Sequence, residues 1–161
     1  MIEQRNTVML QLSVSSILDR VYTASAMTEL AGMNGASRER YIRVTRDHER
    51  LLLTFMKDAC SGLAMELMPY LEDCHIDEAG MVDGMVDYEL RLPAEVARSH
   101  TLALCRRMEY AIALNVLEGV WLGYDIDMTD YYRRRASEAT DEVKSYVLRI
   151  PVAPLRLVGH W

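Results

Sequence analysis

One short segment in the middle of the chain contains every common type of metal ligand. The ligand types fall within five residues, at Cys74, His75, Asp77 and Glu78. Their spacing matches neither a tetrahedral zinc pattern nor a calcium-binding loop, and a strand would turn neighbouring side chains to opposite faces. We therefore interpret this group as a solvated acidic turn, and we expect no metal site and no cofactor.

Nucleophiles and bases elsewhere also lack the spacing that catalysis requires. His100 and Cys105 fall five residues apart on one predicted helix, about 500° around its axis, and so lie on different faces. No glycine-rich loop follows a strand to bind a phosphate. The odd number and the spacing of the cysteines indicate reduced thiols that pack as small hydrophobic side chains; they are Cys60, Cys74 and Cys105. We expect a protein that is not an enzyme.

Most of the net charge of the chain lies in one segment, residues 73–92. The chain has a formal net charge of −6, and this segment has six acidic residues against a single base, Arg91. The same segment is the only one with a clear β-pattern, which predicts a charged β-hairpin that projects from a helical body. The acids that we expect to form an electrostatic surface are Asp77, Asp83, Asp87 and Glu89.

The only basic cluster consists of Arg133, Arg134 and Arg135. The sequence pI is about 5.2 and several acids flank the cluster, so a solvated helix with internal ion pairs is favoured over a nucleic-acid surface. Arg134 and Glu138 have the i, i+4 spacing of such a pair. The cluster is also a candidate partner for the acidic residues of a neighbouring copy.

The end of the chain, residues 150–161, is an apolar segment that contains two prolines. Proline has no amide proton to donate, so the segment cannot continue a helix, and its apolar side chains favour docking over exposure. We expect an extended arm beyond a single domain of residues 1–149. The arm docks either on its own body or on a neighbouring copy. The residues that we expect to make the contact are Pro151, Pro154, Leu155 and Trp161.

Hydrophobic periodicity predicts a mainly α-helical bundle in one domain. A helix is expected over about residues 16–31. A second helix of about 25 residues is expected to begin at Thr45 and, because of Pro69, to kink or end around residues 70–72. Apolar residues alternate from Val8 to Val14, and this pattern fits either a strand or an early helical turn. A chain of 161 residues is long enough to bury one core.

Strict alternation predicts a half-buried strand over residues 85–92, with residues 74–76 as a short partner strand. Pro93 then closes the strand and opens a long helix over about residues 94–123. This helix is apolar around much of its circumference, with Leu102 on one of two buried stripes, so we expect it to be central. The expected architecture is two long helices joined by a small β-hairpin.

A last helix is expected over about residues 128–149, beginning after Asp127 or Thr129. It is polar on most faces and has one apolar stripe at helical spacing. The stripe comprises Tyr132, Ala136, Ala139, Val143 and either Tyr146 or Val147.

The order of these elements resembles the head–tail connector and adaptor proteins of tailed phages and prophages. The resemblance covers roughly residues 45–161 and leaves residues 1–44 outside the pattern. It rests on the prolines of the arm and on three runs, Asp87-Tyr-Glu-Leu-Arg-Leu-Pro93, Val120-Trp-Leu122 and Tyr131-Tyr132 through Val147-Leu-Arg149.

The resemblance implies a non-enzymatic structural role, in which copies of a small helical bundle form a ring at the portal. Acidic residues then line the channel, where repulsion keeps DNA from sticking. The implied partners are further copies of the chain and portal and tail proteins, without sequence-specific nucleic acid or a membrane. The start of the chain has no basic segment before an apolar core, and no apolar run reaches the length of a membrane span. We expect a location in the host cytoplasm, followed by incorporation into a virion.

Two alternatives stay open at this point. One is a small cytoplasmic ligand-binding protein or enzyme with a pocket between the two long helices. The polar residues that such a pocket would use are Glu66, Asn115 and Glu118, although each also fits an ordinary helix surface. The other is a regulatory adaptor that binds another protein through the acidic hairpin.

Overall fold

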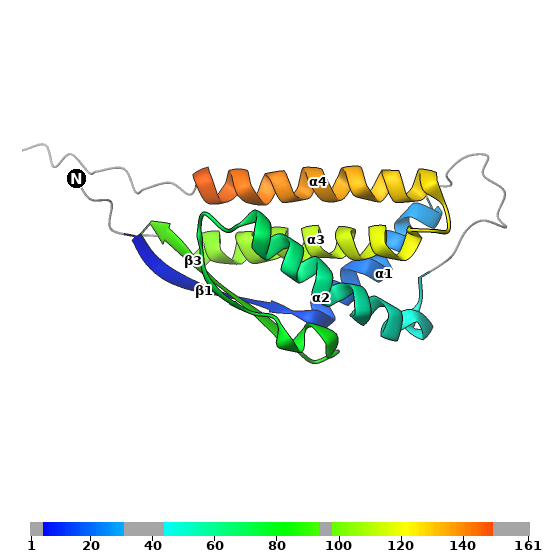
Figure 1. Ribbon diagram of the computed structural model, residues 1–161, viewed down its shortest axis with the longest axis horizontal. Helices are drawn as coiled ribbons and strands as arrows, with labels where there is room; N and C mark the ends of the chain where they lie inside the picture. The colour runs from blue at the N-terminus through cyan, green and yellow to red at the C-terminus, as the bar shows by residue number, and fades with distance from the viewer. Residues whose placement is uncertain (1–4, 31–43, 94–97, 150–161) are drawn as a thin grey trace, which may run out of the picture.

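The computed structural model describes residues 5–30, 44–93 and 98–149, and these form a mainly helical protein with one small antiparallel sheet (Figure 1). Two short 3₁₀ helices, η2 and η3, separate the longer elements. In chain order the elements are β1 (Arg5–Ser13), α1 (Val14–Leu30), η2 (Arg46–His48), α2 (Glu49–Glu66), β2 (Leu71–His75), η3 (Asp77–Gly80), β3 (Met85–Pro93), α3 (Arg98–Trp121) and α4 (Ile126–Arg149).

The sheet has the strand order β1-β3-β2, with both pairs antiparallel. β1 pairs with β3 from Arg5 opposite Pro93 to Ser13 opposite Met85. The alternation in β1 therefore produces a strand, because its partner lies about eighty residues away and supplies the ladder of backbone hydrogen bonds. The expected alternation in β3 is confirmed, with every second side chain of this strand buried.

The β-element does not project from the helical body, contrary to the sequence-based expectation. β3 is the central strand, and its inner side chains Val86, Tyr88, Leu90 and Leu92 are fully buried in the common core. Apolar side chains on one face of a strand need a covering layer, and here the helices provide it. Only the outer face of the sheet and the loop between β2 and β3 face solvent.

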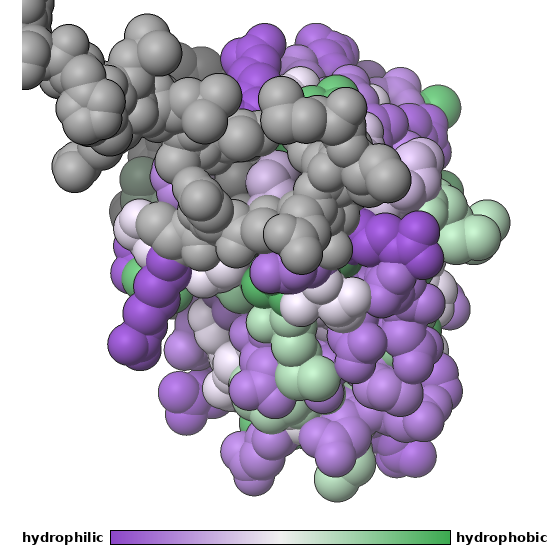
Figure 2. Space-filling view, turned by 90° about the vertical axis from the view of Figure 1, so that its left-hand side faces the viewer, coloured by the Kyte–Doolittle hydropathy of each residue, from purple (hydrophilic) through white to green (hydrophobic). Residues whose placement is uncertain are grey.

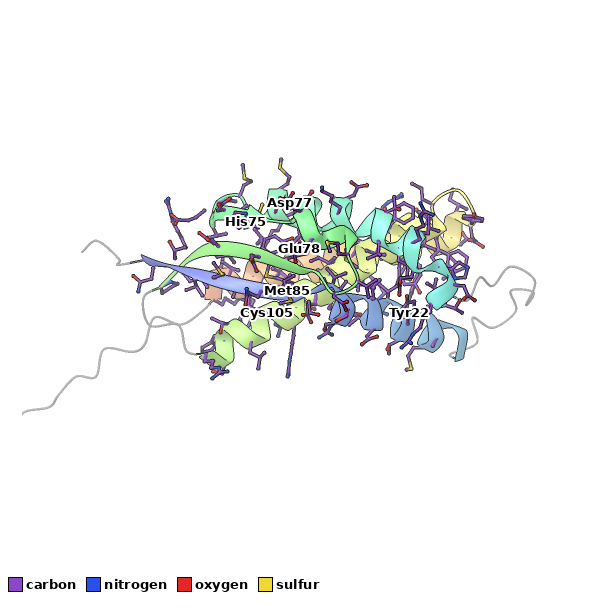
Figure 3. All side chains as sticks on the ribbon, turned by 90° about the horizontal axis from the view of Figure 1, so that it is seen from below. Tyr22, His75, Asp77, Glu78, Met85 and Cys105 are labelled. Carbon is purple, nitrogen blue, oxygen red and sulfur yellow. The ribbon has the colours of Figure 1, made fainter. Side chains whose placement is uncertain are left out.

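α3 lies at the centre of the protein, as its two apolar stripes predict. It packs against α4, α2, α1 and β1. α4 covers one side of α3, the sheet lies on the other, and α1 and α2 flank it (Figures 1 and 3). The molecule therefore has two unlike outer surfaces, an outer helix and the exposed face of a sheet.

Several predicted boundaries differ from the structure. α2 ends at Glu66, before Pro69, because the chain already turns over residues 67–70. Leu102 is 52% exposed, since no described element covers that side of the first turns of α3. Residues 94–97, where this helix was expected to begin, lie outside the described residues.

α4 begins slightly earlier than Asp127 or Thr129. Gly123, with φ of 90°, ends the preceding turn, and Asp125 caps the new helix. Its Oδ1 accepts the amide protons of Asp127 at 2.9 Å and Met128 at 3.0 Å. A carboxylate at this position satisfies amides that have no partner inside the helix. The predicted buried stripe of α4 is confirmed, with Val147 buried and Tyr146 half-buried.

Candidate functional site

α4 packs mainly against α3, and this leaves an open groove along each of its flanks. One groove lies between α4 and α1, and the other lies between α4 and α2, with α3 at the floor of both. We call them the α1–α4 groove and the α2–α4 groove. They share α3 and α4 and differ in the helix that forms the second wall.

The α1–α4 groove has a volume of about 750 Å³ and mostly apolar walls. Leu114 of α3 is buried beneath it, and Tyr131 and Tyr132 of α4 stand beside it. Its lining residues are Ser16, Asp19, Arg20, Thr23, Ala24, Met27, Tyr110, Leu114, Tyr131, Tyr132 and Arg135.

Arg135 is held at this groove by two tyrosine hydroxyl groups. Its Nη1 donates to the Tyr131 oxygen at 2.9 Å and its Nη2 donates to the Tyr110 oxygen at 2.6 Å. The hydrogen bond to Tyr131, more than any other contact, raises the pKa of the Arg135 guanidinium. Among the described residues no carboxylate pairs with Arg135, and each tyrosine oxygen keeps its own proton to donate. A fixed guanidinium and two hydroxyl groups therefore lie ready for an incoming carboxylate.

A buried acid fastens α1 to α3 beside the same groove. Glu109 is only 8% exposed, and its Oε2 accepts hydrogen bonds from Ser16 Oγ at 3.0 Å and Arg20 Nε at 3.3 Å. A buried carboxylate is costly without such partners. The positive charge of Arg20 is therefore paired with a carboxylate of the same chain. Sequence analysis missed Glu109, although an acid within the apolar run 108–114 is a visible signal.

The α2–α4 groove is smaller, about 340 Å³, and its charges are already paired. Lys144 Nζ lies 2.8 Å from Glu66 Oε2, and Arg133 Nε lies 2.8 Å from Glu118 Oε1. Asn115, the third residue of the predicted pocket, donates to the Ala111 carbonyl oxygen at 2.9 Å. The structure thus brings the three predicted pocket residues to one groove, but their hydrogen bonds and ion pairs are internal.

The basic cluster of α4 is dispersed by the helix. Successive residues are about 100° apart, so Arg133 and Arg135 point to opposite flanks and Arg134 points between them. Arg133 also pairs with Asp130, at 3.0 Å. The expected pair of Arg134 with Glu138 is not among the ion pairs of the described residues. Only Arg134 and Arg135 therefore remain available to a neighbour's acids.

The outer face of the sheet carries two of the predicted acids. Asp87 and Glu89 lie on β3, half-buried, and Glu89 faces Asp73 across the β2–β3 pair. Like charges opposite each other on a sheet repel. One carboxylate oxygen of Asp87, Oδ1, is buried and has no hydrogen-bond partner among the described atoms.

At one end of this face, basic and hydroxyl groups offset the charge. Thr7 and Arg91 both donate to the carboxylate of Glu72, and the Thr7 hydroxyl, followed by Arg91, lowers the pKa of that carboxyl. The negative character is therefore strongest from the middle of the sheet toward the loop that joins β2 to β3.

That loop, residues 76–85, carries the other two predicted acids, Asp77 and Asp83, and we call it the acidic loop. Figure 3 labels Asp77. Both side chains are exposed and have no ion-pair partner among the described residues. The loop contains no Lys or Arg. Its negative charge is therefore not neutralised locally.

The acidic loop is folded tightly. Glu78 Oε2 accepts the amide proton of Met85 at 3.0 Å, and Ala79 is fully buried. A Cβ at Gly84 would lie 2.1 Å from the Glu78 carbonyl oxygen, so only glycine fits there. Asp77, Glu78 and Met85 consequently hold a fixed arrangement at the end of the sheet (Figure 3).

The cysteines occupy three different environments. Cys60 is fully buried, and burial raises the pKa of its thiol to about 12. Burial also raises the pKa of the half-buried Cys74 and Cys105 thiols. Such thiols are protonated at neutral pH and are weak nucleophiles.

The predicted contact residues of the arm lie outside the described residues. They are Pro151, Pro154, Leu155 and Trp161. Within the described ranges, no group of three or more metal-ligand side chains is close enough together to hold an ion, and no helix has the length and apolarity to span a membrane.

The end of the molecule where β3 and α4 finish shows mostly hydrophilic side chains with scattered apolar ones (Figure 2).

The two strongest candidate surfaces are the α1–α4 groove, with its fixed guanidinium, and the acidic loop, whose acids have no ion-pair partner among the described residues. Comparison of the chain with protein-family models, with curated proteins and with solved structures finds no match.

Proposed function

We propose that this chain is a non-enzymatic assembly protein, of the head–tail connector or adaptor kind found in phages and prophages, whose copies associate into a ring. The observation that carries the proposal is the pairing of two unlike surfaces on one small protein. One is an acidic loop without a local counter-charge, and the other is an open groove with a fixed guanidinium.

Surfaces of this kind suit head-to-tail association between copies. When two different patches of one protein are complementary, each copy binds the next one in the same direction, and the series closes as a ring or continues as a filament. The acidic face of the sheet adds to this role. In a ring that encloses DNA, carboxylates such as Asp87 and Glu89 would repel phosphate groups rather than bind them.

The arm supports the same role from sequence. An apolar segment with two prolines, at residues 150–161, is typical of an extended element that docks on a neighbour. Removal of the arm should therefore weaken assembly, while the helices of residues 98–149 keep their own core contacts.

The test is co-expression of the tagged chain with its neighbouring genes, followed by light scattering. The full chain and a form that ends at Arg149 are compared. The proposal predicts a large ring or a complex with a portal or tail protein, and predicts its loss in the shortened form. A compact monomer that binds neither kind of protein, with or without the arm, would contradict the proposal.

A second candidate function is small-molecule binding in the α1–α4 groove. Its volume of about 750 Å³ lies in the range of ligand sites, and its walls combine tyrosine rings with a few polar groups. Thermal-shift screening with small carboxylic acids would test it. Stabilisation that Arg135→Gln removes would favour this function over assembly.

A further inference from the structure

We infer that the acidic loop of one copy docks in the α1–α4 groove of the next copy, with Asp83 and Asp77 directed to Arg135. The inference rests on the proposed assembly function and names the contact that would drive it.

The charges of the loop and of the groove are complementary. Asp77 and Asp83 are exposed carboxylates without an ion-pair partner among the described residues, and Arg135 is a guanidinium without a carboxylate partner in the same ranges. An Arg–carboxylate contact is charge-assisted and directional, so it fixes orientation as well as strength.

The two walls of the groove differ in charge. Arg20, on the α1 wall, already pairs with Glu109, and Asp19 of the same wall is acidic. The α1 wall therefore repels carboxylates, and the α4 wall attracts them. An acidic segment in the groove has one favoured orientation, with its acids toward α4.

The loop and the groove both expose apolar side chains. The acidic loop exposes two methionines, Met81 at 59% and Met85 at 39%. The groove offers tyrosine rings and the buried side chain of Leu114. Methionine is flexible and makes favourable contacts with aromatic rings, so it suits an irregular groove of this kind. Loop and groove thus match in both charge and apolar character.

Both contact surfaces are held in place by internal contacts. The loop is fixed by the Glu78–Met85 hydrogen bond and by the close approach at Gly84. The guanidinium of Arg135 is fixed by its two tyrosine partners. Two elements that are already ordered lose little conformational entropy when they meet. The contact joins different surfaces of each copy, so association continues from copy to copy.

The test uses charge-reversed variants of the full chain, measured by sedimentation equilibrium at concentrations that approach millimolar. Arg135→Glu damages the groove and Asp83→Arg damages the loop. We expect each variant to weaken self-association by about tenfold or more. The matched control is Arg133→Glu, which makes the same charge change on the other flank of α4 and should leave self-association unchanged.

Mixing the variants gives a sharper readout. In an equimolar mixture the intact loop of the Arg135→Glu variant meets the intact groove of the Asp83→Arg variant, and the two reversed charges also attract each other, so the mixture should associate more strongly than either variant alone. A single chain with both substitutions should recover higher association, because its reversed charges again attract. Circular dichroism confirms that each variant is folded.

Three outcomes would overturn the inference. They are a wild-type chain that stays monomeric throughout, variants that associate as the wild type does, or equal damage from Arg133→Glu. Association that survives both charge reversals removes this contact but leaves the assembly function, which the co-expression experiment decides separately.

Discussion

The two grooves beside α4 show how one helix can present two different surfaces. On the α2 flank, Arg133 and Lys144 are neutralised by Glu118 and Glu66. On the α1 flank, Arg135 meets only tyrosine hydroxyl groups. The grooves differ in volume, about 750 Å³ against about 340 Å³, and they also differ in whether their charges are paired within the chain. We infer that the first flank stabilises the fold and the second is available to a partner.

The buried leucines that line the two grooves should contribute equally to stability. Leu114 of α3 lines the α1–α4 groove and Leu63 of α2 lines the α2–α4 groove, and each is 2% exposed. Leu114→Ala and Leu63→Ala should each lower the free energy of unfolding by about 3 kcal/mol, since each leaves a cavity in the core. Urea denaturation would measure both. If only one of the two substitutions lowered the free energy of unfolding by well under about 3 kcal/mol, the packing beneath the two grooves would differ as well as their charges.

The acidic residues of the two flanks should contribute different amounts to the free energy of unfolding. Glu109 is buried and holds Ser16 and Arg20, so Glu109→Ala should cost about 2 kcal/mol of unfolding free energy. Glu118→Ala removes a partly exposed pair with Arg133 and should cost about 0.5 kcal/mol. The same denaturation experiment serves both variants, and equal costs would contradict the distinction.

The inner face of α2, in contrast to both grooves, is buried in the core. The dependence of folding stability on alkaline pH should therefore reflect the burial of its thiol, Cys60. Burial raises the pKa of Cys60 to about 12 from 9.0. Above pH 9 the unfolded thiol loses its proton and the folded one keeps it, so stability should fall as pH rises, by about 1 kcal/mol toward about pH 10. Cys60→Val removes this thiol, and its stability should fall less steeply over the same interval. An unchanged slope would place the effect elsewhere.

The smallest expected effect separates the two arginines. Arg133→Gln should lower stability by about 0.5 kcal/mol at low salt and by less at high salt, because its ion pairs are exposed and screened. Arg135 has no carboxylate partner among the described residues, so the effect of Arg135→Gln on stability should not depend on salt. Thermal melts at two salt concentrations would measure the difference. A salt-dependent loss at Arg135 would reveal a partner within the chain.

Much of the helical architecture could be predicted from local pattern. The two apolar stripes of α3 and the single stripe of α4 follow helical spacing, and both helices form as expected. The alternation in β3 likewise identified which face is buried. These features depend on neighbours in sequence, and periodicity reports them directly.

Features that depend on distant contacts could not be predicted. β1 was ambiguous until its pairing with β3 was known, and that same pairing makes β3 a central strand rather than part of a projecting hairpin. The ion-pair partners of the arginines could not be predicted from sequence either. Helical spacing suggested Arg134 with Glu138, but the observed pair joins Arg133 to Glu118 of another helix. The α1–α4 groove is formed by three separate helices, and no local motif marks it.

The most direct test of the loop-to-groove contact is a paramagnetic relaxation measurement between copies. A spin label at Met81→Cys, on a chain with Cys74→Ser and Cys105→Ser, is mixed with isotope-labelled wild-type protein. The contact predicts that amide signals along residues 16–27 and 131–135 are weakened, while those along residues 62–66 keep their intensity. Weakened signals along the α2–α4 groove instead, or no weakening at any concentration, would contradict it.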